Sequence, residues 1–218
     1  IWMKDYLQLE GFAYKLVPIK TPIADNNPFD MGRIDSEKMY QLVKNWKWGN
    51  SGNPDVYHDV ETRRNSITYR GHIARLIETL INENELKKAE EIADLGMEKM
   101  PVDIFGYYTF LEPFIGAYYE VKAKEKARKL YKNVTLKYQE SLTYYSRVSE
   151  ENQSKYIQTI YSDIERYKSL VDTISLYEEE GFIKIEMEKF NGYLRLFTGG
   201  NAESTFESEA IELSLIHI

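Results

Sequence analysis

The stretch of residues 61–101 carries the pattern that most constrains the fold of this chain. Apolar residues recur there every three or four positions, in two runs separated by a turn at residues 82–84, and this spacing predicts amphipathic helices. Small residues share one face of the second run and allow close helix packing: Ala89, Ala93 and Gly96. Gly71 weakens the first run by about 1 kcal/mol relative to Ala, and Pro101 should end the second. We therefore expect an antiparallel helical hairpin.

A second hairpin is predicted in residues 107–148. The segment KEKARKL at 124–130 corresponds to LKKAEEI at 86–92, with a separation close to the roughly 34-residue period of tetratricopeptide repeats. Pro113 predicts that the first helix of this pair starts late, near Leu111. The expected fold class is mainly α, built of antiparallel helical hairpins of tetratricopeptide-repeat-like type, with a short irregular or β segment at the N-terminus.

Three regions follow from this reading. Residues 1–60 should form an extended or loop segment that packs on the helical part and contains a strand around Phe12, Tyr14 and Leu16 and one helix, from 36 to about 46, capped by Asp35. Residues 61–198 should form the tetratricopeptide-like domain, including one helix over 151–180 and another over 182–197. Residues 199–218 should be a disordered tail, and we interpret LSLIHI at 213–218 as an adapter-derived scar.

Composition and motifs exclude several classes of function. The net charge is −7, which opposes general nucleic-acid binding. The chain has no cysteine, so thiolate zinc sites, redox motifs and disulfides are excluded. It also lacks the H-E-x-x-H and phosphate-binding glycine motifs. We expect no catalytic residue, no metal site and no cofactor in this fragment.

Three local features allow two interpretations each. The oxygen-rich loop 50–61 could bind Ca²⁺, but we favour turn-forming residues followed by a helix cap at Asp59. Six tyrosines on the second hairpin could stack on sugars or fill partner pockets, but we favour helix–helix seams; they are Tyr118, Tyr119, Tyr131, Tyr138, Tyr144 and Tyr145. The basic run 122–132 could face anionic lipids, but its interleaved glutamates favour a solvated helix face.

Four segments occur in an order that resembles one family. They are KDYLQLEGFAYKLVPIK, GRIDSEKMYQLVKNWKWGN, NPDVYHDVETRRNS and RGHIARLIETLINE. The family is the C-terminal soluble region of bacterial multi-pass membrane proteins with a domain of unknown function. These proteins are also classed as glycosyltransferase family 117, similar to protein O-mannosyltransferases. The resemblance covers about residues 6–197 and is most specific in the first half.

The resemblance implies a parent chain in the bacterial inner membrane, with this region on the periplasmic side. It implies a catalytic membrane domain upstream that uses a lipid-linked sugar, whose acidic catalytic residues have no counterpart here. The first hypothesis is therefore a non-catalytic accessory domain for acceptor or partner interaction. The alternative is an independent helical-repeat scaffold that binds a protein or peptide through Tyr69, Arg70, His72 and Arg75. A small stand-alone hydrolase ranks last, because no nucleophile–base pair is visible.

The candidate binding residues lie where the family-like segment enters the first hairpin. They are Trp46, Trp48, Asp55, Tyr57, Tyr69 and His72. The expected partner is a protein or peptide rather than a nucleic acid, and no particular oligomeric state is predicted.

Overall fold

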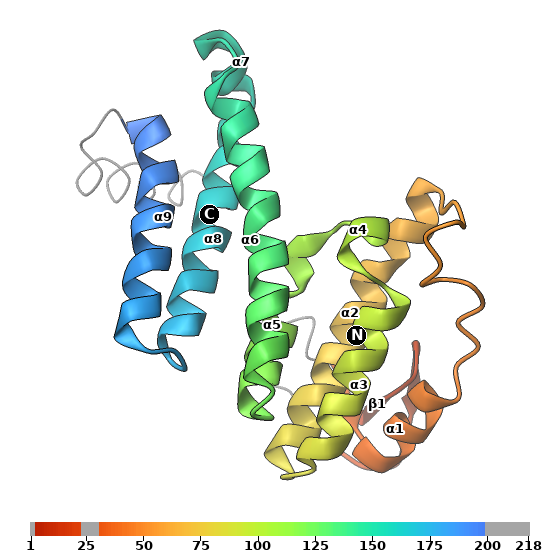
Figure 1. Ribbon diagram of the computed structural model, residues 1–218. Coiled ribbons are helices and arrows are strands. Elements are labelled where there is room, and N and C mark those ends of the chain that lie inside the picture. Colours follow the sequence, from red (N-terminus) through yellow and green to blue (C-terminus); the bar gives the residue numbers. More distant parts are fainter. Residues whose placement is uncertain (1–2, 23–30, 199–218) are drawn as a thin grey trace. The chain divides into compact units, whose positions relative to one another are not determined.

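The structure is a computed structural model that describes residues 3–22 and 31–198 (Figure 1). It is mainly helical, with helical hairpins and a small sheet near the N-terminus, which confirms the predicted fold class. The predicted tail at 199–218, with its scar at 213–218, lies outside the described residues. The chain divides into two compact units, Ile1–Leu130 and Tyr131–Ile218. Each is described by itself.

Three short strands form the sheet in the described part of the first unit: β1 (Leu7–Glu10), β2 (Ala13–Leu16) and β3 (Arg33–Ile34). A 3₁₀ turn, η1 (Lys4–Tyr6), precedes them. The strand order is β2-β1-β3, with β1 antiparallel to β2 and parallel to β3. The predicted strand is confirmed as β2, which contains Tyr14 and Leu16, but Phe12 lies just before it. Gly11 adopts a φ of +68° and reverses the chain, so Phe12 lies in a hairpin turn, because glycine reaches this conformation without strain.

Local capping signals position the next two helices. The Asp35 side chain accepts a hydrogen bond from the Lys38 amide at the start of α1 (Ser36–Lys44). The Asp59 side chain does the same for the Thr62 amide at the start of α2 (Val60–Asn82). Both caps were predicted and are confirmed. Leu42 is 36% exposed on the outer side of α1, whereas Met39 and Val43 of the same helix are buried.

The predicted first hairpin is α2 packed against α3 (Leu86–Lys99), with Asn84 in the turn at a φ of 61°. The chain continues through α4 (Val102–Phe105) and η3 (Tyr108–Phe110) to α5 (Glu112–Glu120). Pro113 occupies the first turn of α5, as predicted. A Cβ added at Gly96 would lie 3.0 Å from the Phe114 ring, so the small-residue face of α3 lets α5 approach closely.

The helix α6 (Lys124–Ser146) begins in the first unit and continues into the second. At its start, the Lys126 ammonium pairs with Glu90 and Asp94 of α3, at 2.7 and 2.6 Å. The predicted tyrosine seams are confirmed for the four buried rings, Tyr118, Tyr119, Tyr131 and Tyr138. Tyr144 is exposed, so the seam interpretation fails there.

The second unit also contains α7 (Glu150–Lys155), α8 (Ile157–Ser175) and α9 (Glu180–Thr198). The predicted continuous helix over 151–180 is wrong. The backbone leaves helical geometry at Tyr156, where ψ is 11°, and α8 ends at Ser175. Ile157, the first residue of α8, is 49% exposed. The second predicted helix is confirmed, but Gly181 lies in the first turn of α9 rather than breaking the preceding helix.

Buried aromatic and ionic contacts hold the second unit together. The Tyr167 ring is fully buried between Tyr138 and Phe190, with ring centroids 6.3 and 5.3 Å away. The Glu186 carboxylate is buried and binds the Lys189 ammonium at 2.6 Å and the Tyr131 hydroxyl at 3.2 Å. Because both carboxylate oxygens are occupied by donors, we assign Glu186 a structural role.

Candidate functional site

A cavity of about 300 Å³ in the first unit gathers aromatic side chains from the sheet, the α1–α2 loop, α2 and α4. We call it the aromatic pocket. Its lining consists of Phe12, Trp46, Lys47, Trp48, Asn50, Ser51, Val56, His58, Thr62, Tyr69, Met100 and Phe105. Pockets of this kind, apolar with a few polar groups, are the default expectation for a binding site.

The hairpin turn supplies one side of the pocket. The Phe12 ring stacks on the Trp46 ring with centroids 3.7 Å apart, and its centroid is 4.1 Å from that of Tyr69. The Gly11 amide donates to the Met39 sulfur at 3.0 Å, which ties the turn to α1. A Cβ at Gly11 would lie 3.4 Å from the Trp46 ring. The positive φ and this close approach therefore both favour glycine at the turn.

The loop between α1 and α2 supplies the opposite side. Its Trp48 ring meets Trp46 edge-on, with centroids 5.2 Å apart. The His58 ring nitrogen Nε2 lies 3.1 Å from the Ser51 carbonyl and so closes the loop on itself. A Cβ at Gly52 would collide with the Glu98 carbonyl, so the loop lies directly against the end of α3.

Two buried polar atoms in the aromatic pocket have no hydrogen-bond partner among the described residues. They are the indole nitrogen Nε1 of Trp48 and the hydroxyl oxygen Oγ of Ser51. An unsatisfied buried group costs about 1–3 kcal/mol, and most buried polar groups in proteins are paired. Both atoms belong to residues of the pocket lining but are shut off from solvent, so a ligand could supply the missing partners only after a neighbouring side chain moves.

The structure brings three of the six predicted binding residues together, since Trp46, Trp48 and Tyr69 all line the aromatic pocket. Tyr57 lies outside it and is 84% exposed. Asp55 is also exposed and outside the pocket, on a turn in which its amide donates to the Asn53 side chain. The ring nitrogen Nδ1 of His72 lies 3.1 Å from the Gly11 carbonyl, and burial lowers the pKa of His72. His72 therefore supports the hairpin turn from α2.

Two of the four residues named for the scaffold alternative, Arg70 and Arg75, bind backbone carbonyls. Arg75 donates to the Met31 and Gly32 carbonyls at 2.9 and 2.7 Å. Arg70, predicted to be exposed, is fully buried. Its guanidinium donates to the carbonyls of Met100, Gly106 and Tyr107. These cations hold backbone in place, because each finds carbonyl acceptors inside the unit.

Sequence reasoning missed Phe12, Ser51 and His58 as pocket residues. The signal for Phe12 was the glycine before it, which marks a turn rather than the middle of a strand. Ser51 and His58 lie in the loop that was interpreted as turn-forming. Nothing in their spacing shows that they face the tryptophans, because that contact depends on how the loop folds over α3.

Asp59, at the end of the α1–α2 loop, serves as the helix cap. Asp59 accepts from the Thr62 amide at 3.0 Å and from the Thr62 hydroxyl at 2.7 Å, and these hydrogen bonds lower the pKa of Asp59. In the described ranges 3–22 and 31–198, no three His, Asp or Glu side chains are grouped as a metal site would require. The predicted cap at Asp59 is confirmed by its hydrogen bond to the Thr62 amide.

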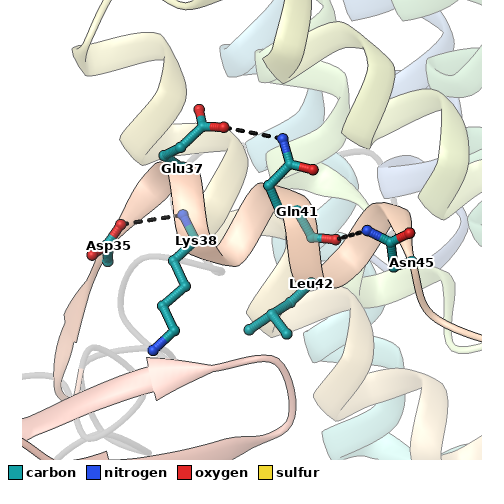
Figure 2. Close-up of a pocket in the computed structure, with 6 residues that line it drawn as sticks. All are labelled: Asp35, Glu37, Lys38, Gln41, Leu42 and Asn45. Atoms are coloured by element: carbon teal, nitrogen blue, oxygen red, sulfur yellow. Dashed lines mark hydrogen bonds between the residues drawn. The ribbon is translucent and has the colours of Figure 1, made fainter.

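A second hollow lies over the outer side of α1 (Figure 2). Its polar side chains are already paired along the helix. The Gln41 amide donates to Glu37 at 3.0 Å, and the Asn45 amide donates to the Gln41 carbonyl at 2.7 Å. Because Leu42 is its one apolar side chain and its polar groups are paired, this surface is a weaker candidate than the aromatic pocket.

Comparison with known proteins gives one family-level finding. A family model described as "TMEM260-associated domain 2" matches residues 1–38, which contain the sheet and the start of α1. The searches of curated proteins and of solved structures found no match. In the part of the chain that the structure describes, no helix is both long and apolar enough to span a bilayer. The N-terminal match indicates a domain associated with a membrane protein.

Proposed function

We propose that the chain is a non-catalytic, extracytoplasmic accessory domain of a membrane-embedded glycosyltransferase similar to protein O-mannosyltransferases. Its role is to bind an acceptor or another partner protein. The observation that carries this proposal is the aromatic pocket, whose walls are large rings and whose unpaired atoms are one indole nitrogen and one hydroxyl. Rigid aromatic anchors surrounding a few polar groups are typical of recognition sites.

The pocket does not support catalysis by its own residues. A serine nucleophile needs a base within hydrogen-bond reach of its hydroxyl. His58 contacts the carbonyl of Ser51, and the Ser51 hydroxyl has no partner among the described residues. Among those residues, no Asp or Glu lines the pocket to orient the histidine. The hydrolase hypothesis therefore gains no support, although a histidine and a hydroxyl lie in one cavity.

The membrane context rests on a family-model match and on a resemblance. The match of residues 1–38 is to a domain associated with a membrane protein. The resemblance to glycosyltransferase family 117 adds a bacterial inner-membrane parent with this region on the periplasmic side. In this proposal the upstream membrane domain performs the sugar transfer, and the present chain contributes binding.

The membrane context is tested by the gene. The reading frame upstream of Ile1 should encode several hydrophobic segments of about 20 residues each. A frame without them would contradict the proposed parent.

The binding role is tested in cells by placing a photoreactive amino acid at Lys47, on the pocket lining, in the full-length protein. We expect cross-links to a protein partner. The matched control carries the same photoreactive group at Lys184, an exposed position on α9. Equal cross-linking from both positions, or none from Lys47, would contradict a partner at the aromatic pocket.

A further inference from the structure

We propose that the aromatic pocket binds an extended, proline-containing peptide segment. In this complex a proline ring lies on the Trp46 and Tyr69 rings, and a peptide carbonyl accepts a hydrogen bond from the indole N–H of Trp48. The inference rests on the proposed function, because it names the chemical class of the partner that the accessory domain takes up.

The walls of the pocket favour this ligand. Trp46 lies between Phe12 and Trp48, with ring centroids at 3.7 and 5.2 Å. Polyproline II segments dock in aromatic-lined grooves, because they are already extended and lose little conformational entropy on binding. The cavity of about 300 Å³ beside these rings has room for the backbone that adjoins the proline.

The unpaired atoms favour it as well. An indole nitrogen donates only, so Trp48 needs an acceptor. A polyproline II segment has no internal hydrogen bonds, so all its carbonyls are free to accept. The Ser51 hydroxyl, also unpaired in the described structure, can pair with a second group of the peptide. One bound segment would thus satisfy both atoms that the free protein leaves without partners.

Phe12 occupies the place that we assign to the proline ring. It is 43% exposed on the hairpin turn, yet it stacks on Trp46 and contacts Tyr69. Neither unpaired atom reaches solvent in the free protein, so a ligand must move a neighbouring side chain. Phe12 is then an internal competitor, and its removal should favour the peptide.

A carbohydrate fits the pocket less well. A pyranose carries hydroxyls around its ring, and each hydroxyl buried without a partner costs free energy. Among the described residues that line the pocket there is no carboxylate to accept hydrogen bonds from these hydroxyls. A proline ring carries no hydroxyl, so its burial leaves no such group to be paired.

The test is a titration of the whole ¹⁵N-labelled chain with acetylated, amidated hexaproline, followed through the indole N–H signals. The Trp48 signal, assigned by its loss in Trp48→Phe, should move downfield as the hydrogen bond forms. The dissociation constant should be on the order of 0.1–1 mM for so short a ligand. A glycine–serine peptide of equal length and methyl α-mannoside serve as comparison ligands.

Three pocket variants and one control variant sharpen the result. Ser51→Ala and Trp48→Phe should each weaken hexaproline binding by about tenfold. Phe12→Ala should tighten it by about threefold or more, an effect that a purely structural role for Phe12 would not produce. Tyr57→Phe, outside the pocket, should leave the affinity unchanged.

Two outcomes overturn the inference. One is the absence of any Trp48 shift with hexaproline, and the other is a stronger shift with methyl α-mannoside. Neither outcome decides the proposed function, because partner cross-linking from Lys47 is measured separately. A protein cross-link without hexaproline binding would retain the accessory role and remove the proline-peptide assignment alone.

Discussion

The buried Arg70 should be one of the strongest single contributors to the stability of the first unit. Its nitrogen Nη2 donates to the Met100 carbonyl at 2.8 Å, and its Nη1 donates to the carbonyls of Gly106 and Tyr107 at 2.7 and 3.1 Å. Burial lowers the pKa of Arg70 to about 10, so the side chain remains charged at pH 7. Gly106 and Tyr107 both have positive φ angles, so the arginine binds the end of α3 to an unusual turn.

The expected magnitude follows from what Arg70→Met would leave behind. Each hydrogen bond from a charged donor is worth about 1.5–3 kcal/mol, and each orphaned buried carbonyl costs about 1–3 kcal/mol. The methionine offsets part of this loss, because it removes the desolvation of a buried cation and of the unpaired Nε. We expect a net loss of about 3–5 kcal/mol in the free energy of unfolding.

Urea unfolding followed by tryptophan fluorescence isolates this effect. All three tryptophans belong to the sequence of the first unit, so the signal reports that unit rather than the second. Arg64→Met, at an exposed position on the same helix, is the matched control and should change stability by less than about 0.5 kcal/mol. If Arg70→Met unfolds within that same margin of the wild type, the reasoning about the buried guanidinium is refuted.

Three further substitutions should change the stability of the protein or its dependence on pH. Gly71→Ala should raise stability by about 1 kcal/mol in urea unfolding, since an added Cβ meets nothing within 4 Å; a loss would show an unseen contact. Burial lowers the folded-state pKa of His72 below 6.5. The contribution of the neutral ring to the free energy of unfolding should therefore be fully present above that pH and be lost as the pH falls below it. His72→Gln should reduce the difference in urea midpoint between pH 7.5 and 5.5, and an unchanged difference would contradict this. Burial raises the pKa of Asp163 despite its 2.6 Å hydrogen bond from Ser141. Ionisation of Asp163 therefore destabilises the folded state as the pH rises. Asp163→Asn should leave the melting temperature at pH 7 unchanged or raise it, and a lower melting temperature would contradict this.

The parts of the fold that could be predicted depend on short-range chemistry. Asp35 and Asp59 cap helices because their carboxylates reach amides three residues ahead. Pro113 marks the start of α5 because the first turn needs no amide donor there. The α2–α3 hairpin follows from apolar periodicity around a short turn. Each of these signals is contained within a few consecutive residues, so the sequence alone reveals it.

The parts that could not be predicted depend on contacts between distant residues. Arg70 has the helical spacing of the buried residues Ile73 and Ile77, but a charged residue is rarely buried unless it is paired. Its carbonyl partners lie 30 to 37 residues further on. The break at Tyr156 carries no glycine or proline. In the pocket, Trp46, Trp48 and Tyr69 could be nominated from position and residue type. Their meeting with Phe12 depends on a hairpin turn more than 30 residues away, which no local pattern specifies.

The close approach of Gly52 to the Glu98 carbonyl has a consequence for how this region can vary in evolution. A side chain at that point would push the α1–α2 loop off the end of α3, and Trp48 and Ser51 would move with it. The exposed positions just beyond it, from Asn53 to Asp55, carry no such constraint. We expect homologous chains to accept insertions and substitutions at this tip while retaining glycine at the contact. The outer edge of the loop would then vary while the contact with α3 stays the same.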